Sequence, residues 1–148
     1  MNALVPALTS VVRHNAPAIE LNVTLRMEKI WRRCAETELS GDYFPITECN
    51  GSPDDWYVCQ FDDEKAGKGV IIAVRNTRAK DESFMFVPPC IREKKTYSFE
   101  IAGESVTDIL ANGRPVGEKS RISSSSLRKG MKIVIPKRSG AVIFYRYS

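Results

Sequence analysis

The residues of this chain that could perform acid–base or nucleophilic chemistry are few and scattered. Asp54 and Asp55 are adjacent in a turn-rich segment, where carboxylates normally accept hydrogen bonds from nearby backbone N–H groups. His14 is the only histidine, and no serine lies in a Gly-x-Ser-x-Gly elbow, so a Ser-His-Asp triad lacks its parts. The sequence also contains no P-loop and no dinucleotide-binding fingerprint. We therefore expect no catalytic residue and no cofactor-binding residue.

The four cysteines are Cys34, Cys49, Cys59 and Cys90, and none of them forms a C-x-x-C pair. With a single histidine in the chain, a zinc site has too few ligands. Cys59 falls in a strand-like run, where a free cysteine behaves as a small hydrophobic residue. We expect no bound metal, and we expect reduced thiols.

Length, composition and charge are those of one ordinary globular domain. The chain has 148 residues, of which 43% are hydrophobic and 27% charged, so it can bury a real core but is short for a (β/α)8 barrel of roughly 250 residues. The net charge of +4 comes from basic and acidic residues that are mixed along the chain, which argues against nucleic-acid binding. No apolar run approaches the roughly 20 residues of a membrane-spanning helix.

The N-terminal part predicts one amphipathic helix. Residues 1–16 lack the ordered parts of a signal peptide, and together with the expected reduced thiols this favours a cytoplasmic location. Pro17 suits the start of a helix over residues 18–35. Its apolar residues recur at steps of three or four and form one stripe: Ile19, Val23, Met27, Ile30, Trp31 and Cys34.

Residues 40–61 predict the joint between this helix and a β domain. Tyr43, Phe44 and Ile46 form a β-prone run in which Pro45 allows an edge or irregular strand but not a central one. Residues 56–61 alternate bulky groups on both faces of a second strand. Residues 50–55 between the two runs are rich in turn formers, so a hairpin or a sheet corner is expected. Residues 62–69 read as the next turn, charged and glycine-containing.

Many short strands separated by turns follow, which is typical of an antiparallel β-sandwich of Greek-key type. Residues 70–74 are apolar on both faces, as in a central strand that ends at Arg75. Asn112-Gly113 predicts a two-residue hairpin, and Pro115 places the returning strand at an edge. A serine ahead of residues 127–130 fits a capped helical turn closed by glycine. The predicted domains are an N-terminal helical segment, residues 1–38, and a sandwich, residues 39–148.

An ordered set of motifs in this chain resembles the C-terminal module of α-galactosidases, the family 36 glycoside hydrolases and their relatives. The matching residues are Gly41, Asp42, Tyr43, Phe44, Pro45, Ile46 and Thr47, then Asp55, Trp56, Gln60, Phe61 and Asp62, then Gly67, Gly69 and Arg75, and Tyr145 in the last strand. The resemblance runs from about Ile19 to the C-terminus. It implies that the N-terminal helix corresponds to the last helix of the catalytic barrel, and that the chain lacks the barrel strands that carry the catalytic carboxylates.

The resemblance implies a non-catalytic accessory domain that packs against a catalytic (β/α)8 barrel, in the parent enzyme or in a partner chain. The isolated chain is then expected to be inactive. Two alternatives stay open: a free-standing interaction protein, and a carbohydrate-binding module with Tyr43, Trp56 or Tyr57 as stacking platforms. A packed Trp56 ring would favour the accessory role, because aromatic residues on alternating strands are more often core.

Counting apolar faces gives a further expectation. Residues 56–61, 70–74 and 142–147 carry apolar groups on both faces, so one sheet has a second face that must be covered. The N-terminal helix is the candidate cover within the chain, and a homodimer that shares these surfaces is the alternative.

Overall fold

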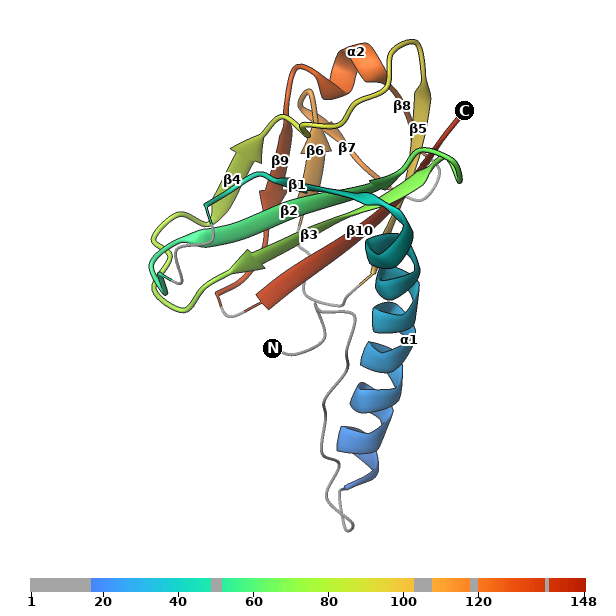
Figure 1. Ribbon diagram of the computed structural model, residues 1–148. Helices are drawn as coiled ribbons and strands as arrows, with labels where there is room; N and C mark the ends of the chain where they lie inside the picture. The colour runs from blue at the N-terminus through green and yellow to red at the C-terminus, as the bar shows by residue number, and fades with distance from the viewer. Residues whose placement is uncertain (1–16, 49–51, 103–107, 118–119, 138) are drawn as a thin grey trace.

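A computed structural model describes residues 17–48, 52–102, 108–117, 120–137 and 139–148. The elements, in chain order, are α1 Ala18–Ser40, β1 Asp42–Pro45, β2 Trp56–Asp63, β3 Lys68–Arg75, β4 Ser83–Phe86, β5 Thr96–Ala102, β6 Asp108–Ala111, β7 Arg114–Pro115, β8 Arg121–Ser123, α2 Ser124–Leu127, β9 Met131–Val134 and β10 Ser139–Tyr147. Six strands form one sheet in the order β1-β2-β3-β10-β5-β8, and four form the other in the order β4-β9-β6-β7. Figure 1 shows the two sheets and the helix that precedes them. The predicted fold class, an antiparallel β-sandwich after one helix, is confirmed.

The main core lies between the two sheets. Alternate residues of the long strands point into it, as the period of two along a strand requires. Ile71 and Ala73 come from β3, Ala141 and Ile143 from β10, and Ile133 from β9 in the facing sheet. All five are at most 1% exposed, so this layer is a closed apolar interior.

The proline and turn predictions are confirmed. β1 ends at Pro45 and β7 at Pro115, and each of these strands is the outermost of its sheet. Asn112 and Gly113 both have positive φ between paired strands β6 and β7, which is the backbone of a type I′ hairpin. The side chain of Ser123 accepts a hydrogen bond from the Ser126 N–H and thereby caps the short helix α2.

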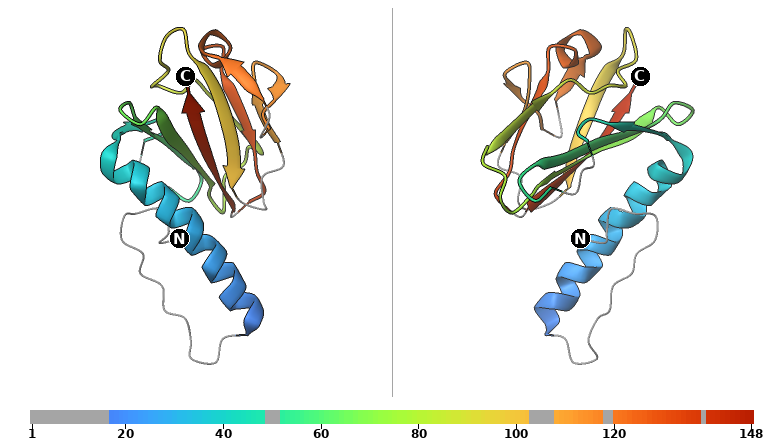
Figure 2. Two further views of the ribbon diagram at one scale, coloured as in Figure 1. Left: turned by 90° about the vertical axis from the view of Figure 1, so that its right-hand side faces the viewer. Right: turned by 60° about the vertical axis from the view of Figure 1, so that its left-hand side comes forward.

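A second apolar cluster covers the outer face of the six-stranded sheet. Cys59, Val70, Ile72 and Phe144 point outward from β2, β3 and β10, and Cys34 of α1 lies on them. The expectation that the helix packs against the sandwich is therefore confirmed for its C-terminal half, where Ile30 is partly buried at the same contact, whereas Val23 and Met27 of the predicted stripe are exposed. Figure 2 shows α1 crossing this face and continuing past it. Among the described residues, no helix is both long enough and apolar enough to cross a membrane.

Two predicted boundaries were wrong. The helix runs to Ser40 and not to residue 35, because Thr37 in the extra turn is buried against the sheet. The segment predicted as a charged turn from residue 62 begins only after Asp63, since Asp62 and Asp63 are the last residues of β2. Both aspartates are buried, because they have polar partners that lie far away in the sequence.

Substitution of Gly69 tests how closely the Tyr145 ring of β10 packs on β3. A methyl group at this position would overlap the ring of Tyr145 and lie 2.5 Å from the carbonyl oxygen of Phe61. Gly69→Ala should therefore lower the free energy of unfolding by about 1–3 kcal/mol, the usual cost of overpacking, measured by urea denaturation. Gly117→Ala is the control, because the nearest atom to its methyl group would be Ser120 Oγ at 3.9 Å. Equal midpoints for both variants would contradict the prediction.

Candidate functional site

The N-terminal half of α1 exposes large apolar side chains. Leu21, Val23 and Leu25 are each 46% exposed, and Met27 is 41% exposed. In Figures 1 and 2 this half of the helix extends beyond the sheets. We call residues 18–27 the projecting half. Such a contiguous run of exposed apolar side chains is typical of an interaction surface.

The projecting half is poor in charge compared with the rest of the helix. Glu20 and Arg26 are the only charged residues among residues 18–27. Residues 28–40 contain six: Glu28, Lys29, Arg32, Arg33, Glu36 and Glu38. A solvent-facing helix normally carries charge along its free face, whereas the core of a protein interface is depleted in charge. The projecting half is therefore less charged than the part of the helix that packs on the sheet.

The apolar residues of the projecting half lie on two sides. With 3.6 residues per turn, Leu21 and Leu25 share one side, and Val23 and Met27 lie about 160° away from them. Val23 and Met27 continue the line of Ile30 and Cys34, which already packs on the sheet. A helix that is apolar on more than one side is usually enclosed, so one flat partner surface would not cover all four residues.

The C-terminal half of α1 is held to the sandwich by polar contacts as well as by Cys34. The guanidinium of Arg33 donates two hydrogen bonds to the carboxylate of Glu100 on β5, at 2.6 and 2.8 Å. It also lies 4.0 Å from the centre of the Phe144 ring, in cation–π geometry. These contacts fix the direction in which the projecting half points.

The end of α1 is tied to the end of β2. Ser40 Oγ donates a hydrogen bond of 2.6 Å to Asp63 Oδ2, and this bond is the main reason that the pKa of Asp63 is lowered. A methyl group on Gly41 would lie 2.9 Å from the carbonyl of Asp62, so only glycine allows this approach of the two backbones. The joint predicted from the sequence is thus a close, hydrogen-bonded corner.

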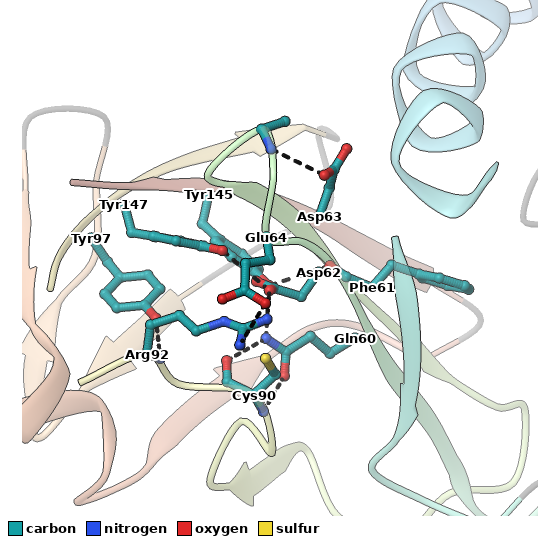
Figure 3. Close-up of polar contacts among 11 residues, drawn as sticks. Gln60, Phe61, Asp62, Asp63, Glu64, Cys90, Arg92, Tyr97, Tyr145 and Tyr147 are labelled. Carbon is teal, nitrogen blue, oxygen red and sulfur yellow. Dashed lines mark hydrogen bonds and ion pairs between the residues drawn. The ribbon is translucent and has the colours of Figure 1, made fainter. Parts of the chain in front are cut away.

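Asp62 is the centre of a buried polar network, which we call the Asp62 hub (Figure 3). Its carboxylate is fully buried and lies 2.9 Å from Arg92 Nη2. The Tyr145 hydroxyl donates to Oδ1 at 2.7 Å, and the Tyr147 hydroxyl donates to Oδ2 at 3.2 Å. Arg92 also pairs with Glu64, at 3.2 Å. A buried charge needs such partners, because its desolvation costs several kcal/mol.

Gln60 extends the hub to the loop between β4 and β5. Its side-chain amide donates to the carbonyl of Cys90 at 2.8 Å and accepts from the Cys90 N–H at 3.0 Å, as a neighbouring strand would. The same nitrogen donates to the Tyr145 hydroxyl at 2.7 Å. The Arg92 N–H donates to the Tyr97 hydroxyl at 2.8 Å. The hub therefore joins β2, β10, β5 and this loop.

The protonation states of the hub are those of a structural network. Burial, followed by the charge of Asp62, raises the pKa of Tyr147 to about 12 and that of Cys90 to about 11. Burial also raises the pKa of Tyr145, and the hydrogen bond to Asp62 raises that of Arg92. At neutral pH the tyrosines stay neutral donors and the Cys90 thiol stays protonated. A general base or an activated nucleophile would need the opposite shifts.

Several residues that carry the family resemblance meet at the hub. Gln60 and Asp62 form it, Gly69 leaves room for the ring of Tyr145, and Gly41 allows the approach to Asp62. The remaining hub residue of importance, Arg92, was missed by sequence analysis. The sequence signal for Gln60 and Asp62 is the alternation of β2, in which these two residues continue the inward positions of Trp56 and Val58.

The three aromatic residues considered as stacking platforms lie on different faces. Trp56 is 7% exposed, stacks on Phe84 at 5.7 Å and donates its indole N–H to the Asp81 carbonyl, so the prediction that it anchors the core is confirmed. Tyr57 is half-buried on the outer face. Tyr43 is 47% exposed there, and its ring packs at 5.1 Å from Phe61. The structure brings Tyr43 and Tyr57 to one face and Trp56 to the other.

The adjacent aspartates lie at one end of the sandwich. Asp54 and Asp55 line a hollow of about 330 Å³ together with Trp56. Asp54 is exposed and pairs with Arg78 at 3.1 Å. Within the described residues no group of three or more potential metal ligands occurs. Cys34, Cys59 and Cys90 are buried and belong to no disulfide, and Cys49 and His14 lie outside the described residues.

No protein-family model matches the chain, and no curated protein matches its sequence.

Removing the charge of Asp62 tests the hub. Asp62→Asn should lower the free energy of unfolding by about 1–3 kcal/mol, because it removes the charged acceptor shared by Arg92, Tyr145 and Tyr147 while Arg92 keeps its ion pair with Glu64. Asp54→Asn is the matched control, since its exposed ion pair with Arg78 should contribute less than about 1 kcal/mol. Chemical denaturation of both variants gives the comparison. Similar losses of unfolding free energy in Asp62→Asn and Asp54→Asn would contradict the prediction that the buried Asp62 carboxylate stabilises the fold more than an exposed ion pair does.

Glu38 gives a pH-dependent prediction. Burial raises the pKa of its carboxyl, and Oε1 is buried without a hydrogen-bond partner in the described part of the chain. A raised folded-state pKa stabilises the fold at low pH, and this contribution is lost as the pH rises through that pKa. Glu38→Gln should therefore raise Tm at pH 7, and the gain should disappear below the ordinary glutamate value of about 4.3. The control is Glu36→Gln, which removes an exposed carboxylate. A gain in Tm of Glu38→Gln that does not change with pH would contradict the raised pKa of Glu38.

Proposed function

We propose that this chain is a non-catalytic accessory β-sandwich of an α-galactosidase-type glycoside hydrolase, and that α1 docks it on a catalytic (β/α)8 barrel. The observation that carries the proposal is the projecting half of α1, which is apolar on two sides, poor in charge and exposed. Such a helix is suited to pack among the elements of a larger folded domain. In the resembled enzymes the corresponding helix is the last of the barrel.

The Asp62 hub supports the same proposal. Residues that carry the resemblance serve the packing of the module, as Gly69 and Gly41 show through the contacts that a methyl group would make. Neutral tyrosines and a protonated thiol around Asp62 offer no acid–base pair. The role that fits these residues is to hold a rigid domain whose helix points in one direction.

A homodimer through the projecting half alone is a weaker explanation. Ten helical residues span roughly 15 Å, and a stable interface buries about 800 Å² on each partner. A second copy of the helix would also cover only one of the two apolar sides. A partner that encloses the helix between its own elements satisfies both conditions.

A carbohydrate-binding module is also less well supported. A stacking platform presents a flat aromatic face to the sugar, and Trp56 instead packs on Phe84 within the core. Tyr43 remains the exposed aromatic residue among the three candidates.

The proposal is tested by binding to a barrel. The chain should co-purify with the catalytic barrel of an α-galactosidase expressed without its own C-terminal module. The double variant Leu25→Glu/Met27→Glu places a charge on each apolar side and should weaken binding at least about tenfold, since each change exposes a charge to an apolar interface. Met85→Glu is the control, because Met85 is 68% exposed on β4 of the other sheet.

Activity supplies the second measurement. The chain alone should not hydrolyse a chromogenic α-galactoside, whereas turnover by the barrel should become more stable to heat when the chain is bound. No binding to the barrel, equal weakening by Met85→Glu, or turnover by the purified chain alone would each refute the proposal.

A further inference from the structure

A hollow of about 270 Å³ lies between the C-terminal half of α1 and the outer face of the six-stranded sheet. One wall is formed by α1, through Arg33, Glu36 and Thr37. The sheet supplies Lys68, Ser98, Glu100 and Arg146, together with one glycine and three aromatic residues of the same strands. The volume is just below the roughly 300–1,000 Å³ of sites for drug-sized molecules, so the hollow suits a smaller ligand.

The charges that line the hollow are largely compensated within it. The guanidinium of Arg33 donates two hydrogen bonds to the carboxylate of Glu100, and Glu36 lies 3.5 Å from Lys68. The hydrogen bond from Arg33 is the main reason that the pKa of Glu100 is lowered, and the charge of Arg146 acts in the same direction. A charged ligand would compete with one of these ion pairs, whereas a neutral ligand would not.

The hydroxyl of Thr37 lacks a hydrogen-bond partner within the described part of the chain. Thr37 is only 2% exposed, and its carbonyl oxygen accepts from the Gly41 N–H, but its side chain forms no hydrogen bond there. Among the described residues, the side-chain atoms that are both sealed from solvent and unpartnered belong to Glu38, Arg75 and Arg92. Thr37 Oγ1 is not one of them, so it stays open to the hollow that Thr37 lines. Because buried hydroxyl groups are nearly always hydrogen-bonded, this one points to a partner that the hollow receives.

We infer that this hollow binds a small neutral polyhydroxy compound, a single sugar ring, against Thr37 and Ser98. Hydroxyl groups both donate and accept hydrogen bonds, so they match a lining that offers both kinds of group. Glu36 and Glu100 supply carboxylate acceptors. Arg146, Thr37 and Ser98 supply donors, and Ser98 is exposed on β5.

The ring belongs either to a free monosaccharide or to the end of a glycan, since both present the same hydroxyl groups. A ligand in the hollow contacts α1 and the sheet at once, so it should hold the helix more firmly on the sandwich. The site uses none of the three aromatic platforms considered above and none of residues 18–27. The inference therefore does not depend on the proposed accessory role, and its test needs no barrel.

The test is an NMR titration of the full chain at constant ionic strength with D-glucose, D-galactose and D-mannose, following the amide signals of α1 and β5. D-Glucuronate and protonated D-glucosamine carry one charge on the same ring and should bind more weakly than glucose. Maltose distinguishes the end of a glycan from a free sugar.

Variants of Thr37 test the hydroxyl itself. Thr37→Val should weaken binding about fivefold, as expected for the loss of one neutral hydrogen bond, whereas Thr37→Ser keeps the hydroxyl and should bind normally. Thr77→Val is the matched control, because Thr77 is exposed in the loop between β3 and β4. Tm should not fall in Thr37→Val, since the hydroxyl has no partner in the described fold that could be lost.

Saturable shifts with a hexose that weaken in Thr37→Val and persist in Thr37→Ser and Thr77→Val support a site for a sugar ring. Maltose that binds more tightly than glucose supports the end of a glycan, and maltose that binds no more tightly supports the free sugar. The inference is overturned by the absence of saturable shifts with all three hexoses, by unchanged binding in Thr37→Val, or by tighter binding of either charged ring.

Discussion

The burial of one carboxylate, that of Asp62, constrains the rest of the structure. Its charge is compensated by Arg92 from the β4–β5 loop and by two tyrosine hydroxyls from β10. Tyr145 reaches Asp62 only because β3 has glycine at position 69. Three strands and a loop must therefore keep their places together, since removing one partner leaves a charge buried without compensation.

The same corner determines where α1 points. Gly41 brings the helix end against Asp62, Ser40 bonds to Asp63, and Arg33 bonds to Glu100 on the far strand β5. With these contacts and Cys34 on the sheet, the C-terminal half of α1 belongs to the sandwich. The projecting half takes its direction from this anchor, so a partner of the proposed kind would meet a preformed helix, which would lower the cost of association.

Local patterns in the sequence predicted much of the fold. Proline positions identified the edge strands β1 and β7, Asn112-Gly113 identified a hairpin, and two-sided apolar strands identified the face that α1 covers. The hub was not predictable in the same way. Asp62 stands in a charged run that reads as a turn, and its partner Arg92 is 30 residues away in a loop. A local pattern carries no information on such a pairing, although the alternation of β2 placed Gln60 and Asp62 on the inward face.

The position of the hub partners along the chain also bears on the order of folding. Asp62 is separated by 83 residues from Tyr145 and by 85 from Tyr147, so its hydroxyl donors are synthesised well after it. Contacts of such long range form late and slow the folding of β proteins. Until β10 is in place, β2 must leave the Asp62 carboxylate in water, which keeps that end of the strand open on a nascent chain. Pairing of β10 is therefore the step that buries the Asp62 carboxylate.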